Sequence, residues 1–144
     1  MKTVKDILRS KGHDVWSIVP DATVYEALKF MGDKNVGALV VLEGETVVGI
    51  ISERDYARKV ILHGRSSKEL PVREIMSTRV YYVRPEQNIQ ECMALMTEKR
   101  VRHLPAMEND RLIGVISIGD VVKAIIAEHE STIKHLEDYI TGGR

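Results

Sequence analysis

Apolar residues in this chain fall at helical spacing in some segments and at strand spacing in others, and the order of these segments occurs twice. One helical stripe follows Thr23 and another follows Asn88, so these two polar residues are predicted to be helix N-caps. The stripes contain Val24, Ala27, Leu28 and Met31, and then Ile89, Cys92, Met93 and Met96. Each stripe predicts an amphipathic helix with one buried face.

Two short apolar runs follow each predicted helix, with a turn sequence between them, which is the pattern of a β-hairpin. The runs are residues 38–42 and 46–51 in the first half of the chain, and residues 103–107 and 111–116 in the second. Pro105 lacks a backbone donor, so its strand should start there or lie at a sheet edge.

An extended stretch that ends in proline precedes each predicted helix, at residues 15–20 and 80–85. A second helix begins after each hairpin, near Glu53 and near Ile118. The repeated unit is therefore β-α-β-β-α, and the fold class is α+β. A further helix can form in the lead-in segment, residues 4–11.

Residues 20–61 align without a gap with residues 85–126, at an offset of 65 residues. Of the 42 pairs from 20/85 to 61/126, 12 are identical. The alignment includes Gly49-Ile50-Ile51-Ser52-Glu53-Arg54-Asp55 and Gly114-Val115-Ile116-Ser117-Ile118-Gly119-Asp120. A duplication explains this pattern. Each copy has about 60 residues, a size at which isolated domains are marginally stable, so we expect the copies to pack together.

These patterns divide the chain into four segments: a first copy at 3–62, a linker at 63–71, a second copy at 72–128 and a helical extension at 129–144. The extension is predicted from an apolar stripe that outruns the repeat, and Gly142-Gly143 should end its helix. Packing against its own domain or against a second subunit would cover the stripe, and we favour the second subunit. The residues of this apolar stripe are Val122, Ile125, His129, Ile133, Leu136 and Ile140.

The composition disfavours several classes of protein. Lys plus Arg and Asp plus Glu each number 21, so no net charge points to nucleic acid or a membrane surface. No apolar run reaches the ~18 residues of a membrane span, and the N-terminus has no apolar signal core. Cys92 is a single cysteine on an apolar stripe, which favours an inert buried thiol over a redox site. We therefore expect a cytoplasmic protein.

The sequence also disfavours an enzyme. It has no phosphate-binding glycine loop, no spacing typical of a Ser-His-Asp triad, and no His, Asp and Glu cluster for a metal. We predict no catalytic residue and no metal ligand.

The two Gly-h-h-Ser-x-x-Asp motifs, the proline-then-helix starts and Arg102-His103-Leu104-Pro105 resemble a tandem pair of CBS (cystathionine-β-synthase) motifs. The resemblance covers residues 3 to 128 and is closest to the stand-alone bacterial type, also called a Bateman module. It implies two motifs packed through their sheets with pseudo-two-fold symmetry, no catalytic machinery, and adenosine-containing ligands in the cleft between the motifs. It also implies pairing into a disc of four motifs, and hence a homodimer.

The chemistry of the repeated motif suits a nucleotide. Asp55 and Asp120 can accept hydrogen bonds from both ribose hydroxyls, and Ser52 and Ser117 precede helices whose N-termini favour phosphate. The cations that could neutralise phosphate are Arg54, Arg58 and Arg102. Ser-x-x-Asp before a helix is also an ordinary capping pattern, and the two roles are compatible for the serines.

The resemblance implies composite sites, in which residues of one copy act with residues of the other. The first site would combine Ser52, Arg54 and Asp55 with Arg84, Ile89, Arg102 and His103. The second would combine Ser117 and Asp120 with Val19, Val24, Gly37 and Ala38. The first is basic and suits AMP or the pyrophosphate of NAD, whereas the second lacks charge. His103 is expected to make a structural hydrogen bond, with a response to pH near neutrality as the alternative.

We therefore expect a regulatory sensor of adenine nucleotides. No effector domain is recognisable in the 144 residues, so its signal would pass to an unidentified effector protein or through self-association. The alternative is a dimerisation or protein-interaction module whose nucleotide sites are vestigial.

Overall fold

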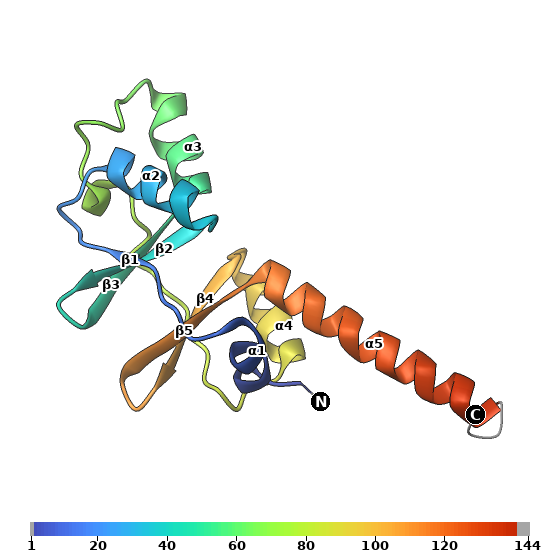
Figure 1. Cartoon of the computed structure of the whole chain (residues 1–144). Helices are drawn as coiled ribbons and strands as arrows, with labels where there is room; N and C mark the ends of the chain where they lie inside the picture. The colour runs from blue at the N-terminus through green and yellow to red at the C-terminus, as the bar shows by residue number, and fades with distance from the viewer. Residues whose placement is uncertain (1, 141–144) are drawn as a thin grey trace. The chain divides into compact units, whose positions relative to one another are not determined.

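The computed structural model describes residues 2–140, apart from the side chains of residues 131–133, 136 and 138–140. The chain folds into two compact units, each built around one β-hairpin (Figure 1). One unit comprises Asp14–Tyr81, and the other comprises the residues through His13 together with those from Tyr82 onward. Each unit therefore joins the hairpin and helices of one copy to the lead-in segment of the other copy, which is residues 4–11 for the first copy and residues 70–77 for the second.

The Asp14–Tyr81 unit holds a three-stranded sheet in the order β1-β2-β3. Strand β1 is parallel to β2, and β2 is antiparallel to β3. Its elements are β1 (Ser17–Ile18), α2 (Val24–Lys34), β2 (Ala38–Glu43), β3 (Thr46–Ser52), α3 (Glu53–Lys59) and the short 3₁₀ helices η1 (Ile61–His63) and η2 (Val72–Glu74).

The other unit holds a two-stranded antiparallel sheet of β4 and β5. Its elements are α1 (Val4–Lys11), α4 (Ile89–Lys99), β4 (His103–Glu108), β5 (Arg111–Ser117) and α5 (Ile118–Ile140). The two hairpins have the same register, with Ala38 opposite Ser52 and His103 opposite Ser117. The predicted α+β fold with two repeated motifs and a C-terminal helix is confirmed.

Pro105 explains the one difference between the sheets. In the first copy, Val40 donates its backbone N–H to the carbonyl of Trp16 and helps to join β1 to the hairpin. Pro105 occupies the equivalent place and has no N–H. The extended stretch before α4 therefore makes only a single bridge, between Val83 and Ala106, where a strand was predicted.

Polar caps start the helices where the sequence predicts them. Thr23 caps α2 and Asn88 caps α4, each accepting the backbone N–H of the residue three positions later. Thr3 caps α1 in the same way, and the carboxylate of Asp6 accepts a hydrogen bond from the Thr3 N–H. These bonds satisfy N–H groups that the helix itself leaves without partners.

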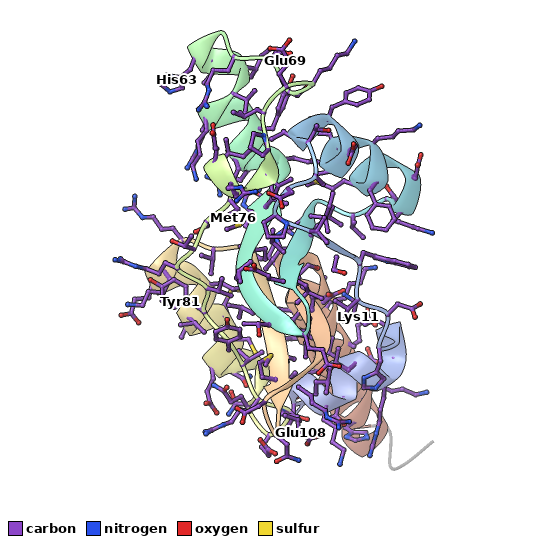
Figure 2. All side chains as sticks on the ribbon, turned by 90° about the vertical axis from the view of Figure 1, so that its left-hand side faces the viewer. Lys11, His63, Glu69, Met76, Tyr81 and Glu108 are labelled. Atoms are coloured by element: carbon purple, nitrogen blue, oxygen red, sulfur yellow. The ribbon has the colours of Figure 1, made fainter. Side chains whose placement is uncertain are left out.

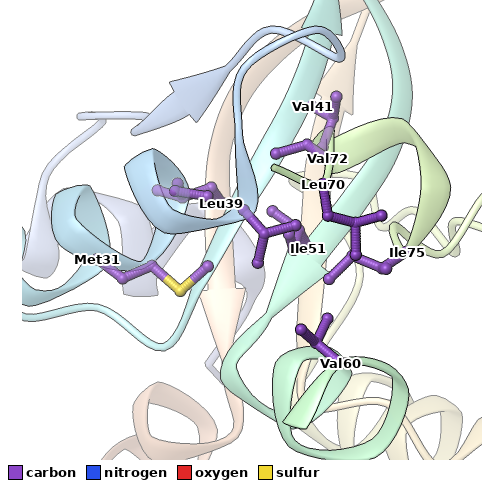
Figure 3. Packing of buried hydrophobic residues seen from close by; sticks show 10 residues of the cluster. Met31, Leu39, Val41, Ile51, Val60, Leu70, Val72 and Ile75 are labelled. Carbon is purple, nitrogen blue, oxygen red and sulfur yellow. The ribbon is translucent and has the colours of Figure 1, made fainter. Parts of the chain in front are cut away.

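One face of α2 packs on the sheet of the Asp14–Tyr81 unit and builds its core (Figure 3). Segment 70–75, which leads into the second copy, completes this core. The buried side chains are Val24, Ala27, Met31, Leu39, Val41, Ile51, Val60, Leu70, Val72 and Ile75. In the other unit, α1 contributes Val4, Ile7 and Leu8 to the buried set in the same way.

The glycine of each repeated motif makes room for a lead-in segment. A Cβ on Gly49 would lie 2.7 Å from Sδ of Met76, which Figure 2 labels, and 2.9 Å from the carbonyl oxygen of Ser77. A Cβ on Gly114 would lie 2.5 Å from Cδ2 of Leu8. Glycine is needed at both positions because the lead-in packs directly on the hairpin backbone.

Helix α5 continues past the repeat, as predicted, and is the longest helix in Figure 1. Of the predicted stripe, Val122 and His129 are exposed and Ile125 is half-buried. The side chains of Ile133, Leu136 and Ile140 and the predicted stop at Gly142-Gly143 lie outside the described residues. Within the described part of the chain, no helix combines the length and the apolar character that crossing a membrane requires.

Candidate functional site

The first repeated motif places Asp55 in the first turn of α3. Ser52 ends β3 and caps the helix, with its Oγ accepting the Asp55 N–H at 3.3 Å. Oδ2 of Asp55 in turn accepts the backbone N–H of Ser52 at 2.9 Å and its hydroxyl at 3.1 Å. Nζ of Lys59 lies 3.3 Å from Oδ1 of Asp55 and donates to the Ile75 carbonyl at 2.8 Å.

The second motif repeats this geometry at the start of α5. Oδ2 of Asp120 accepts the Ser117 N–H at 2.8 Å, and Ser117 Oγ accepts the Asp120 N–H at 3.2 Å. The cation at this carboxylate comes from a different element. Nζ of Lys11, at the end of α1, lies 2.7 Å from Oδ2 of Asp120 and donates to the Val115 carbonyl at 2.8 Å.

The surroundings of Asp120 alter two pKa values. Burial raises the pKa of Asp120, but the hydrogen bonds from Lys11 and Ser117 outweigh burial and leave the pKa below its usual value. Burial lowers the pKa of His103, and the positive charges of Lys11 and Arg102 add to this effect against the opposing charge of Asp120. The lowered pKa favours the neutral form of the His103 imidazole.

The capping role considered for both serines is thus present in the structure. It does not exclude ligand binding, because a carboxylate has about four lone-pair sites. Each aspartate side chain keeps about one sixth of its surface exposed, 17% for Asp55 and 16% for Asp120. A carboxylate with this exposed fraction can still accept a hydrogen bond from a ligand on the solvent side.

Neither Lys59 nor Lys11 was predicted from the sequence as a site residue. Lys59 stands four residues after Asp55, a spacing at which helix residues of opposite charge pair, so its sequence position was a usable signal. Lys11 is 109 residues from Asp120. No local pattern could have indicated that contact, because it depends on α1 packing against the second copy.

The remaining predicted residues divide between the two units. Gly37 and Ala38 lie beside Ser52, and the Gly37 carbonyl accepts the N–H of Glu53. Arg102 and His103 lie beside Ser117 in the equivalent way. Each Ser-x-x-Asp motif therefore adjoins, within its own unit, the pre-strand residues that the resemblance assigns to the other motif's site.

Val24 and Ile89 are fully buried in their cores, and their backbone N–H groups donate to Leu70 and Lys2. Val19 is exposed. Three of the predicted cations, Arg58, Arg84 and Arg102, are also exposed, and Arg54 is half-buried. Across residues 2–140, no group of three His, Cys, Asp or Glu side chains could hold a metal ion.

Two β-hairpin modules, each with a Ser-x-x-Asp helix start and a lead-in segment exchanged with the other copy, define a class of paired modules. A family model for the CBS domain matches residues 4–62 and 72–127, so the chain belongs to the CBS domain family as a tandem pair. Such pairs are non-catalytic regulatory modules, in agreement with the prediction that the chain is not an enzyme. CBS proteins often oligomerise.

Several known proteins are similar along most of the chain. The CBS domain-containing protein CBSX3, mitochondrial, of Arabidopsis thaliana is 44% identical, over 98% of this chain and 73% of its own length. YhcV of Bacillus subtilis (strain 168) is 31% identical over 84% of both chains. A Burkholderia ambifaria MC40-6 structure, described as a signal-transduction protein with CBS domains, is 51% identical with a TM-score of 0.86, over 88% of this chain and 95% of its own.

Proposed function

We propose that this chain is a regulatory sensor that binds an adenine nucleotide, AMP, NAD or a related adenosyl ligand, through Asp55 and Asp120. The observation that supports this proposal is the matched placement of the two carboxylates. Each stands in the first turn of a helix, held by the backbone N–H of the preceding serine, with part of its surface exposed. An ionised carboxylate with exposed oxygen accepts the two donors of a ribose diol.

Arginines that could contact the phosphate belong to both units. Arg54 and Arg58 follow Ser52 on α3, whereas Arg84 and Arg102 belong to the other unit. The family resemblance groups Arg54, Arg84 and Arg102 with Asp55, so the proposal assigns the more basic site to that aspartate. Arginine suits this role because its guanidinium donates two parallel hydrogen bonds to a phosphate.

Titration calorimetry with AMP and NAD tests the proposal. Asp55→Asn and Asp120→Asn keep the size of the side chain and an acceptor for the serine N–H, but remove the charge. Each should weaken nucleotide binding at its own site by at least about tenfold, since a hydrogen bond to a charged group contributes about 1.5–3 kcal/mol. Asp33→Asn, an exposed change on α2, is the matched control. Unchanged binding of both nucleotides in both site variants would refute the proposal.

The alternative function is a dimerisation module with vestigial sites. A ligand that binds only the folded state stabilises it by RT ln(1 + [L]/Kd), about 2.7 kcal/mol at one hundred times Kd. A thermal-shift screen with AMP, ADP, ATP, NAD, NADH and S-adenosylmethionine separates the two functions. A melting temperature that none of these raises would favour the vestigial module.

The proposal includes a homodimer, an unidentified effector protein and a cytoplasmic location, although the Arabidopsis relative is named as mitochondrial. Val122 and Ile126 expose apolar surface on α5, with 42% and 52% of their area accessible, and a second copy would cover it. Deleting residues 129–144 should weaken the dimer in analytical ultracentrifugation and leave nucleotide affinity nearly intact. An unaltered dimer would refute a role for residues 129–144 in dimerisation.

A further inference from the structure

Lys11 brings a cation to Asp120, whose predicted site contains none. Its ammonium lies 2.7 Å from Oδ2 of Asp120, and its side chain keeps 36% of its surface exposed. Both residues belong to the same unit, and Figure 2 labels Lys11 at the end of α1. The contact is therefore between a largely buried carboxylate and an ammonium that can still reach solvent.

The hydrogen bonds of Asp120 leave little room for a second ligand on Oδ2. A carboxylate oxygen has two lone pairs, and Oδ2 accepts both the Ser117 N–H and the Lys11 ammonium. A ribose diol that donates one hydroxyl to each oxygen needs one of these positions. The Ser117 N–H is fixed at the end of β5, whereas the lysine ammonium stands on a flexible four-carbon stem. The diol would therefore displace Lys11.

A displaced ammonium loses its counter-ion. A phosphorylated ligand supplies a new anion, because its phosphate is expected near Ser117, within one helical turn of Asp120. A nucleoside supplies none, so its binding must break the Lys11 ion pair without compensation. We propose that Lys11 is a specificity-determining residue of the Asp120 half, and that it selects phosphorylated adenosyl ligands against free nucleosides. This inference rests on the proposed function.

At Asp55, a diol can bind without displacing Lys59 from the carboxylate. It contacts Oδ1 at 3.3 Å, while Oδ2 accepts the Ser52 N–H and the Ser52 hydroxyl. A hydroxyl rotates about its C–O bond and can release Oδ2 without moving any charged group. A diol can therefore bind Asp55 with Lys59 in place, so the selection is specific to the Asp120 half.

Calorimetric titration with AMP and with adenosine tests the inference in an Asp55→Asn background, which leaves only the Asp120 half. Lys11→Met should weaken AMP and leave adenosine unchanged or tighter, so that the ratio of the two affinities falls on the order of tenfold. Lys11→Arg keeps the cation and should keep the preference for AMP. Lys5→Met removes an exposed cation from the same helix and is the matched control.

The outcomes separate this inference from the proposed function. Wild-type protein that binds none of AMP, NAD and adenosine refutes the proposed function and the inference together, whereas protein that binds NAD but neither AMP nor adenosine refutes only the inference. If wild-type protein binds but the Asp55→Asn protein does not, the Asp120 half is not a site, and only the inference fails. An unchanged affinity ratio in Lys11→Met also overturns it, as does loss of the AMP preference in a Lys11→Arg protein that circular dichroism finds folded.

Discussion

Alanine at Gly114 should destabilise the protein because the lead-in helix α1 packs on the backbone at that position. The added Cβ would lie 2.5, 3.2 and 3.4 Å from Cδ2, Cδ1 and Cγ of Leu8. Leu8 is only 1% exposed, so it cannot move aside without losing burial that stabilises the fold by about 1.5–3 kcal/mol. Overpacking of this kind costs about 1–3 kcal/mol.

The assay is urea unfolding followed by circular dichroism, in which Gly114→Ala should lower the free energy of unfolding by that amount. Gly32→Ala is the matched control, because a Cβ there would have no atom within 4 Å and because alanine favours a helix by about 0.5–1 kcal/mol. The control should therefore be neutral or more stable than wild type.

A double-mutant cycle with Leu8→Ala tests the cause of the destabilisation. Leu8→Ala alone should cost about 2–5 kcal/mol by leaving a cavity. It also makes space for the new methyl group, so the double variant should cost less than the sum by about 1–2 kcal/mol. Strictly additive costs, or a Gly114→Ala protein as stable as wild type, would refute the contact with Leu8 as the reason for glycine.

Two further predictions concern titrating groups. Hydrogen bonds hold the pKa of Asp120 below its usual value, so its contribution to stability is fully present above the unfolded value of about 3.9 and is lost as the pH falls through the folded value. Unfolding free energies from pH 7 to pH 3 should therefore fall less steeply in Asp120→Asn, and equal slopes would contradict the ion pair with Lys11. Burial raises the pKa of Cys92 to about 11, so a disulfide reagent at pH 8 should label this thiol only after urea unfolding. Prompt labelling of the folded protein would show that the thiol is accessible.

The local structure of this chain follows from short-range patterns. Helix starts at Thr23 and Asn88 were predictable, because a cap acts on a backbone group only three residues away. The hairpins were predictable because alternation and turn residues lie within about fifteen positions of one another. The duplication added the equivalence of Asp55 and Asp120, which no single motif could provide.

The contacts around the candidate site could be predicted only in part. The Ser52–Asp55 and Ser117–Asp120 bonds span three residues and match the capping pattern. The contact between Lys59 and Asp55 was also predictable, because the two residues are four positions apart on one helix. The two-residue strand β1 has no counterpart before α4, a loss that Pro105 explains once the pairing partner is known.

The sequence by itself determined the repeat, the order of helices and strands, and the two carboxylates at equivalent helix starts. Only the tertiary structure decided that each lead-in segment packs with the other copy, which makes glycine necessary at Gly49 and Gly114 and brings Lys11 to Asp120. The physical reason is the distance along the sequence over which each kind of interaction acts. Caps and hydrophobic periods act over a few residues, whereas the contact between α1 and the second copy joins side chains more than one hundred positions apart through burial, which leaves no local pattern in the sequence.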